Sequence, residues 1–169
     1  TSVLEIAVTN STPTSIAQTT NELLVATRGG TELRAYDKAT LTFLSNALNL
    51  AGDTIVFNSR DSQLITANPT TVSVFDHVAS ENTLSLVSDD PANGATLALK
   101  LSPNNDRLAL VVPGGNASFA GVNVINDYDS ANAHDAFGAW KIEASPTSAA
   151  FSPLNSDGLD SDSDYLLAS

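Results

Sequence analysis

The clearest metal-binding chemistry in this sequence lies near its end, where acidic side chains alternate with small ones. Asp160, Asp162 and Asp164 follow one another at every second position. Carboxylates at this spacing can converge on one ion when the loop curls, and Ca²⁺ takes about six to eight oxygen ligands. The candidate calcium ligands are therefore Asn155, Asp157, Asp160, Asp162 and Asp164.

This acidic segment departs from the helix-flanked calcium loop. No Gly follows the third Asp, and no Glu closes the site. A second acidic segment, 127–138, is expected at the same end of the neighbouring repeat, so that Asp129 or Asp135 would complete the ligand shell. The alternative is a solvated loop of Ser and Asp residues that holds no metal. Both interpretations stay open.

If Ca²⁺ binds, it should stabilise the folded chain by mass action, because the unfolded chain does not assemble the site. We expect the melting temperature to rise with Ca²⁺ and to fall when a chelator is added. Scanning calorimetry of the wild type and of an Asp160→Ala/Asp162→Ala variant checks this. Identical melting with Ca²⁺ and with chelator would leave a solvated acidic loop.

Patterns for other catalytic chemistry are missing from the sequence. It contains no strained Ser elbow, no zinc-binding His pair and no P-loop. The two histidines are His77, expected as a turn residue at a strand end, and His134 in the acidic segment 127–138. We therefore assign no catalytic and no cofactor-binding residues.

The elements that would position these loops follow a repeated pattern of short strands. An apolar residue lies seven positions before the first Leu of the next strand in three copies, and a fourth copy has a longer insertion. Repeats of about 40–50 residues made of short strands are typical of β-propeller blades. We expect the four apolar residues of the repeat to occupy equivalent positions on the innermost strands of their blades; they are Ile16, Phe57, Leu101 and Phe151.

Each copy is expected to fold into four antiparallel strands, since β-rich runs alternate with turn residues and no helical period persists. The predicted fold class is all-β, with about three and a half blades in a single region, 1–169. The predicted blades span 14–47, 54–87, 96–143 and 148–169. Residues 2–8 are expected to form an outer strand of a preceding or closing blade.

The ends of the third strands and the turns after the inner strands resemble those of WD40 and YVTN β-propellers. The strand ends read Ala35-Tyr36-Asp37 and Val74-Phe75-Asp76, and one turn reads Leu101-Ser102-Pro103-Asn104-Asn105. The Gly-His and Trp-Asp pairs of true WD40 blades are absent. The resemblance implies a propeller fold and a habit of binding, and it does not imply a reaction.

Because propellers typically have about 4–8 blades, we expect these blades to belong to a larger propeller. The strand edges near Ser2–Val8 or Leu166–Ser169 would then pair with another polypeptide, since open apolar edges recruit partners. The alternative is a small ring closed by residues 2–8.

The amino-acid composition argues against nucleic acid and a membrane span, and it indicates a cellular location. The 169 residues carry 19 acidic and 7 basic side chains and a net charge of −12, which argues against nucleic acid as a partner. No apolar run approaches the roughly 20 residues of a membrane span. The acidic surface and the absence of cysteine fit an extracellular or cell-surface protein.

Two classes of function remain. The first is a non-enzymatic binding or assembly module, whose partner is another protein or the remaining blades of the same protein, with oligomer formation included. The second is a Ca²⁺-dependent propeller hydrolase, similar to a lactonase or a phytase. Such an enzyme should hold acids on its inner strands, and the predicted inner strands 14–17, 54–57, 96–99 and 148–151 contain none. This pattern favours the binding module.

Overall fold

The computed structural model describes most of the repeat region. The described residues are 12–28, 32–48, 50, 54–69, 71–78, 83–91, 98–103, 105, 107–112, 121–126, 136–141, 146–151 and 166–168. All regular structure within these ranges is antiparallel β-sheet. The predicted all-β fold class is confirmed. The predicted strand at residues 2–8 lies outside the described residues.

In the described ranges, fourteen strands form three four-stranded sheets and one two-stranded sheet, each in sequence order. The first sheet contains β1 (Thr12–Gln18), β2 (Glu22–Arg28), β3 (Glu32–Asp37) and β4 (Phe43–Leu48). The second contains β5 (Thr54–Asn58), β6 (Gln63–Ala67), β7 (Thr71–Val78) and β8 (Thr83–Pro91). The third contains β9 (Ala98–Leu101), β10 (Arg107–Val112), β11 (Gly121–Asn126) and β12 (Ala136–Lys141). The fourth contains β13 (Ala149–Phe151) and β14 (Leu166–Ala168).

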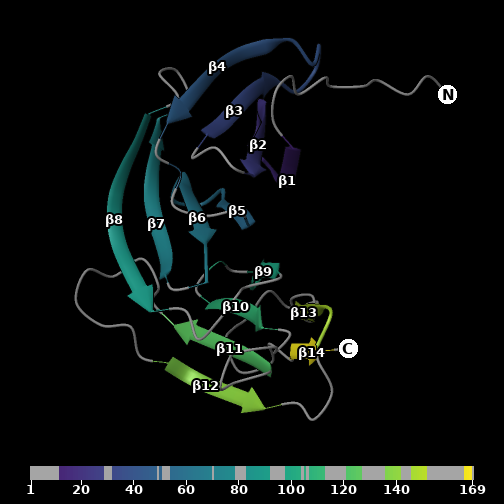
Figure 1. The fold of residues 1–169 in the computed structure, drawn as a ribbon, viewed down its shortest axis with the longest axis vertical. Helices are drawn as coiled ribbons and strands as arrows, with labels where there is room; N and C mark the ends of the chain where they lie inside the picture. Colours follow the sequence, from purple (N-terminus) through teal and green to yellow (C-terminus); the bar gives the residue numbers. More distant parts are fainter. Residues whose placement is uncertain are drawn as a thin grey trace, which may run out of the picture.

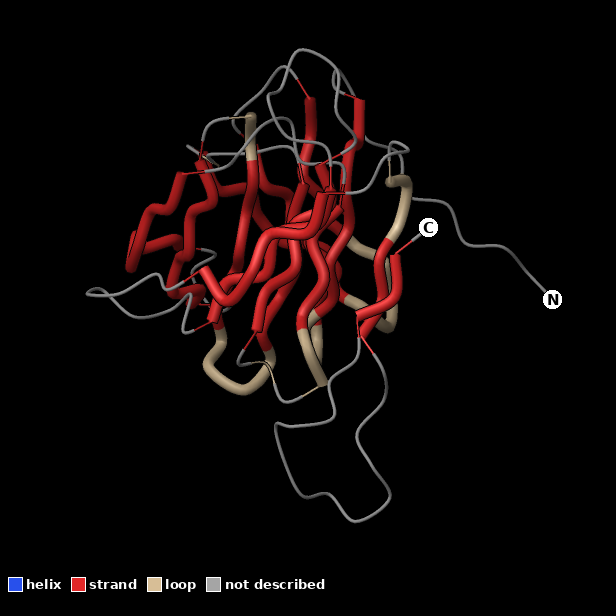
Figure 2. The backbone as a smooth tube through the Cα atoms, turned by 90° about the horizontal axis from the view of Figure 1, so that it is seen from below, coloured by secondary structure: helices blue, strands red, loops and turns tan. Residues whose placement is uncertain are grey.

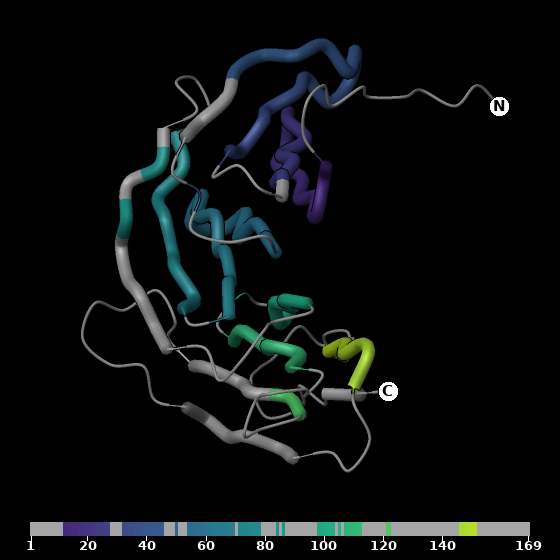
Figure 3. Tube along the Cα trace, in the orientation of Figure 1, coloured from purple at the N-terminus to yellow at the C-terminus, as the bar shows by residue number. Residues whose placement is uncertain are grey.

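The four sheets follow one another along an arc (Figure 1). The first strand of each sheet lies on the concave side, and β4, β8 and β12 lie on the convex side. The concave strands of neighbouring sheets contact each other, β1 with β5, β5 with β9 and β9 with β13. The colours of Figure 3 follow the chain along the arc from the first sheet to the fourth. In Figure 2, strands of neighbouring sheets run side by side, with turns at their ends.

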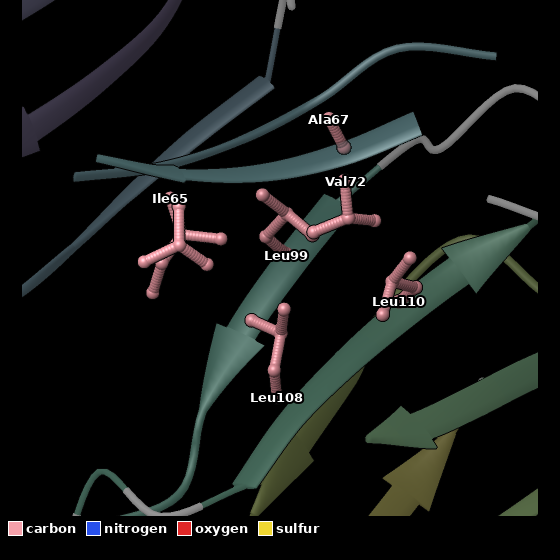
Figure 4. Close-up of a cluster of buried hydrophobic side chains, with 7 residues drawn as sticks. Ile65, Ala67, Val72, Leu99, Leu108 and Leu110 are labelled. Carbon is pink, nitrogen blue, oxygen red and sulfur yellow. The ribbon is translucent and has the colours of Figure 1, made fainter. Parts of the chain in front are cut away.

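Apolar side chains fill each space between neighbouring sheets. The core between the first two sheets contains Leu24, Ala26, Leu33, Ala35, Ile55 and Leu64. The core between the second and third contains Ile65, Ala67, Val72, Val74, Leu99, Leu108 and Leu110, most of them labelled in Figure 4. The core between the third and fourth contains Ala109, Val111, Val122 and Ala149. Alternation along each strand thus gives both faces of the middle sheets an apolar surface, because successive side chains point to opposite faces.

The predicted equivalence of the inner-strand residues is confirmed for three of the four copies. Phe57 pairs with Leu64, Leu101 with Leu108, and Phe151 with Leu166. These three residues therefore occupy the same place in their sheets. In each pair the partner is the apolar residue that begins the hydrophobic part of the second strand.

The prediction for Ile16 is wrong by two residues. Ile16 pairs with Val25, and Gln18 is the residue opposite Leu23. The cause is a shorter hairpin: the Thr19 N–H donates to the Glu22 carbonyl (3.0 Å), which closes a tight turn directly after β1. Ile16 consequently matches Ile55 and Leu99, which pair with Thr66 and Leu110. Its side chain is 60% exposed.

The corresponding turns of the second and third sheets are two residues longer and are held by buried polar side chains. Asn58 Oδ1 accepts the Arg60 N–H (2.9 Å), and Asn58 Nδ2 donates to Asp61 Oδ2 (2.9 Å). In the third sheet, Ser102 Oγ accepts the Arg107 N–H (3.0 Å). Asn58 and Ser102 follow the equivalent residues Phe57 and Leu101 directly, so that one position of the repeat closes both turns.

A hydroxyl links the inner strands of the first two sheets. Ser15 Oγ accepts the Ile55 N–H (3.1 Å) and also lies within donating distance of the Ile55 carbonyl (3.4 Å). Ser15 thus provides a hydrogen-bond partner for the N–H and carbonyl groups of Ile55, which the other strands of the second sheet cannot reach. Such a partner matters because buried backbone groups are costly when unpaired. This contact fixes β1 beside β5.

Candidate binding pocket

The predicted calcium ligands all lie outside the described residues. Nothing in the structure bears on the site, which stays a prediction for Asn155, Asp157, Asp160, Asp162 and Asp164. The same holds for Asp129 and Asp135 of the second acidic segment. Within the described part of the chain, no three His, Cys, Asp or Glu side chains gather in a way that would hold a metal ion.

A cavity of about 330 Å³ opens between the first and second sheets. Its walls come from the tight turn after β1, the start of β2, the turn between β5 and β6, and the end of β7. The lining residues are Thr19, Thr20, Asn21, Glu22, Phe57, Ser59, Ser62 and His77. We call this cavity the inter-sheet pocket. Its position follows from the packing of the two sheets, which brings the start of β2 close to the end of β7.

Among the described residues that line the inter-sheet pocket, Glu22 is the acidic one. It is the first residue of β2 and pairs with Asp37 of β3, and only 6% of its surface is exposed. Its Oε2 atom is buried and has no hydrogen-bond partner among the described residues. Burial raises the pKa of Glu22 above its ordinary value, and His77 acts in the opposite direction. Glu22 is therefore a buried carboxyl group with an unused acceptor.

His77 faces the same cavity, which corrects its expected position in a turn. It belongs to β7 and is buried. Its backbone N–H donates to the Ser62 carbonyl (3.0 Å), and its ring meets Phe57 edge-on with the centroids 5.9 Å apart. Aromatic pairs prefer such an arrangement. The imidazole and the half-buried phenyl ring thus form an aromatic wall of the pocket that Glu22 also lines.

The rim of the pocket carries short polar side chains. Thr20, Asn21, Ser59 and Ser62 are exposed there. The Thr19 hydroxyl accepts the backbone N–H of Asn21 (3.2 Å) and of Glu22 (2.9 Å), and so fixes the turn that forms one side of the rim. The pocket therefore has a polar, solvent-facing mouth above a buried carboxyl group and an aromatic wall.

The raised pKa of Glu22 predicts a pH-dependent stability. A group whose pKa is raised on folding contributes stability below its unfolded pKa, and this contribution is lost as the pH rises through the folded pKa. Glutamine does not titrate. The free energy of unfolding of the wild type relative to Glu22→Gln should therefore fall over the pH range that runs from the ordinary pKa of Glu, about 4.3, upward through the raised pKa of Glu22.

Urea unfolding of both proteins across this range measures the difference. A difference that instead grows with pH would mean that the folded protein stabilises the Glu22 anion, with His77 outweighing burial.

A second cavity, of about 510 Å³, runs along the concave side of the arc. It is lined by residues of β1, β5 and β9, among them the exposed Ile16 and the exposed Lys100. It shares Thr19, Thr20, Phe57 and Ser59 with the inter-sheet pocket. The two cavities therefore adjoin at the turn after β1.

The sequence contains a signal for Glu22 that the repeat pattern alone did not reveal. The first residue of the second strand is polar in all three four-stranded sheets, where Gln63 and Arg107 occupy the place of Glu22. Gln63 is also buried and has an Oε1 atom with no partner among the described residues. A polar residue at the start of the buried second strand in these three blades indicates a position turned toward the next sheet.

No family model matches the sequence, and no curated protein matches it either. Solved structures do. Hydrazine synthase from Kuenenia stuttgartiensis is similar over 92% of this chain and 42% of its own, with a TM-score of 0.67 and 15% identity. The WD40 domain of coronin from Toxoplasma gondii is similar over 94% and 43%, with a TM-score of 0.64 and 10% identity. The β-propeller domain of Swd1 from Myceliophteria thermophila is similar over 81% and 46%, with a TM-score of 0.61 and 12% identity.

The chain has the fold of a WD40-like β-propeller. The four sheets along the arc are therefore propeller blades, and the sequence resemblance to WD40 blades is confirmed. The chain spans less than half the length of these three proteins. At such low identities the likeness establishes the fold and leaves activity open. Among the described residues, no helix is long and apolar enough to cross a membrane.

Proposed function

We propose that this protein is a non-enzymatic binding module of the propeller type, which recognises a partner protein at the end of the blades where the inter-sheet pocket opens. The observation that carries the proposal is the pocket itself. It combines an exposed polar rim, an aromatic wall and a buried carboxyl group with an unused acceptor. Concave sites with a few convergent polar groups are the usual places for ligands.

The arrangement of acids supports binding rather than Ca²⁺-dependent hydrolysis of the lactonase or phytase kind. The strands on the concave side read TPTSIAQ, TIVFN, ALKL and AAF, and none contains Asp or Glu. A calcium site at the centre of the propeller would need several carboxylate or carbonyl oxygens around one point. Among the described residues, Glu22 is the single carboxylate that lines the inter-sheet pocket.

Exposed apolar side chains support a further part of the proposal, assembly with another propeller blade or another protein. Residues directly opposite each other in an antiparallel pair share a face, so that Ile16 lies with Val25 on one face of the first blade. Ile16 is exposed, and so is Phe43 of the outer strand. The net charge of −12 suits an extracellular or cell-surface setting, which we include in the proposal.

A peptide selection tests the proposal. A display library of random short peptides is selected on the immobilised wild-type protein, and the affinity of each selected peptide is measured by fluorescence anisotropy. The key variant is Ser59→Trp, which places an indole at the exposed rim of the pocket. The matched control is Thr12→Trp, an exposed position at the opposite end of β1.

We expect the selected peptides to bind the Ser59→Trp variant about tenfold or more weakly than the wild type, because the indole occupies the mouth. The control should bind within about twofold of the wild type. Two results oppose the proposal: no peptide enriched above background, or selected peptides that bind both variants equally well.

A further inference from the structure

The geometry points to a specific ligand chemistry for the inter-sheet pocket, and this inference rests on the proposed binding function. We infer that the pocket receives a cationic side chain of the partner, an arginine guanidinium, which donates to the carboxylate of Glu22. The inference joins two independent observations. One is a cavity that opens to solvent, and the other is a carboxyl group in its wall that is almost fully buried and has an acceptor without a partner among the described residues.

The carboxyl group gives the first reason for a cation. An ionised carboxylate taken out of water is costly unless a donor or an opposite charge meets it. The described structure leaves Oε2 of Glu22 without a donor, although His77 acts on its charge. A guanidinium supplies a positive charge and several N–H donors in a planar fork, which matches a carboxylate better than any neutral group does.

The aromatic wall favours arginine over lysine. Guanidinium groups stack on aromatic faces, whereas an ammonium is a compact and strongly hydrated charge. The half-buried Phe57 lines the pocket together with Glu22, and its ring is held edge-on by His77. The exposed hydroxyls of Thr20 and Ser59 lie at the rim, where they can accept the remaining N–H groups. A volume of about 330 Å³ suits one side chain, since it lies at the small end of ligand sites.

The surroundings of the pocket agree with a basic partner. The described residues that line it include no Lys or Arg. Two basic residues near the rim make hydrogen bonds to groups other than Glu22. Lys38 Nζ lies 3.5 Å from the Thr19 carbonyl, and Arg60 Nε donates to Asp61 (3.0 Å). The net charge of −12 attracts a positively charged surface over longer distances and should speed its association.

The test uses the peptides selected on the wild-type protein. Each arginine is replaced in turn by citrulline, which keeps the shape and removes the charge. The original and exchanged peptides are titrated against the wild type and against Glu22→Gln. The control is Asp76→Asn, which also removes one negative charge but lies on the exposed end of β7 and retains an oxygen for the Gln63 amide.

We expect one arginine in each peptide whose exchange weakens wild-type binding about tenfold or more, as for hydrogen bonds to charged groups. Glu22→Gln should cause a similar loss with the original peptide and no further loss with the exchanged one, because both changes remove the same contact. Asp76→Asn should stay within about twofold of the wild type. The exchange on the wild type tests the inference even if Glu22→Gln does not fold.

The outcomes separate this inference from the proposed function. Peptides whose binding is weakened by Ser59→Trp but that carry no essential arginine would overturn the inference and leave the proposed binding function intact. An arginine that matters equally to the wild type and to Glu22→Gln would place the cation elsewhere and also overturn it. A selection that yields no pocket-dependent peptide would overturn both.

Discussion

Replacing Leu64 with alanine is expected to lower the free energy of unfolding by about 2–5 kcal/mol. Leu64 lies in β6, is fully buried and belongs to the core between the first two blades. It pairs with Phe57 on one side and with Phe75 on the other. Removing its side chain therefore loses buried apolar surface and leaves a cavity between two sheets that cannot collapse freely.

The same substitution at Leu86 provides the control. Leu86 lies on the outer strand of the same blade, pairs with Phe75 and is 56% exposed. Its replacement by alanine should change stability by no more than about 0.5 kcal/mol, as for most surface positions. Urea unfolding of the three proteins measures both effects. Equal losses at the two positions would contradict the packing of the second blade against the first.

Replacing Asn58 with alanine is expected to cost about 1–3 kcal/mol. The Asn58 side chain is fully buried and holds the turn between β5 and β6 through the Arg60 N–H and the Asp61 carboxylate. Alanine leaves these groups without that partner, and a buried polar group that loses its partner bears a desolvation cost. The loss should appear in urea unfolding as a lower midpoint with an unchanged slope.

Serine is the matched rescue for this position. Ser102 holds the equivalent turn of the third blade with its hydroxyl, which accepts the Arg107 N–H. Asn58→Ser should therefore retain more stability than Asn58→Ala, although serine has fewer heavy atoms with which to fill the site. An Asn58→Ser variant as unstable as Asn58→Ala would show that the turn does not depend on a side-chain acceptor.

The blade pattern could be predicted from sequence because it depends on local spacing. Phe57 and Leu101 precede their partners by the same number of residues, and the pairings follow from that offset. Ile16 has the same offset and still fails, because the Thr19 turn shortens its hairpin and moves β1 along β2. Spacing alone cannot distinguish two turn lengths when both leave an apolar residue on the same face, since side chains alternate with a period of two.

The inter-sheet pocket could not be predicted in the same way. Glu22 and His77 belong to different blades and meet only because their sheets pack together, so that no local motif contains both. His77 was expected in a turn because it follows the aromatic-Asp ending of its strand, but β7 continues through it to Val78. The polar residue that begins the second strand of the first three copies was available in the sequence, and an alignment of the repeats at Glu22, Gln63 and Arg107 would have found it.

Neighbouring blades pack face to face and so build the pocket. Methyl–methyl nuclear Overhauser effects measure this most directly. We predict cross-peaks between the first blade, at Leu24 or Leu33, and the second, at Ile55 or Leu64, since these side chains share one buried cluster. Cross-peaks within each sheet but none between these two sets would contradict the packing, and the pocket would then have no walls.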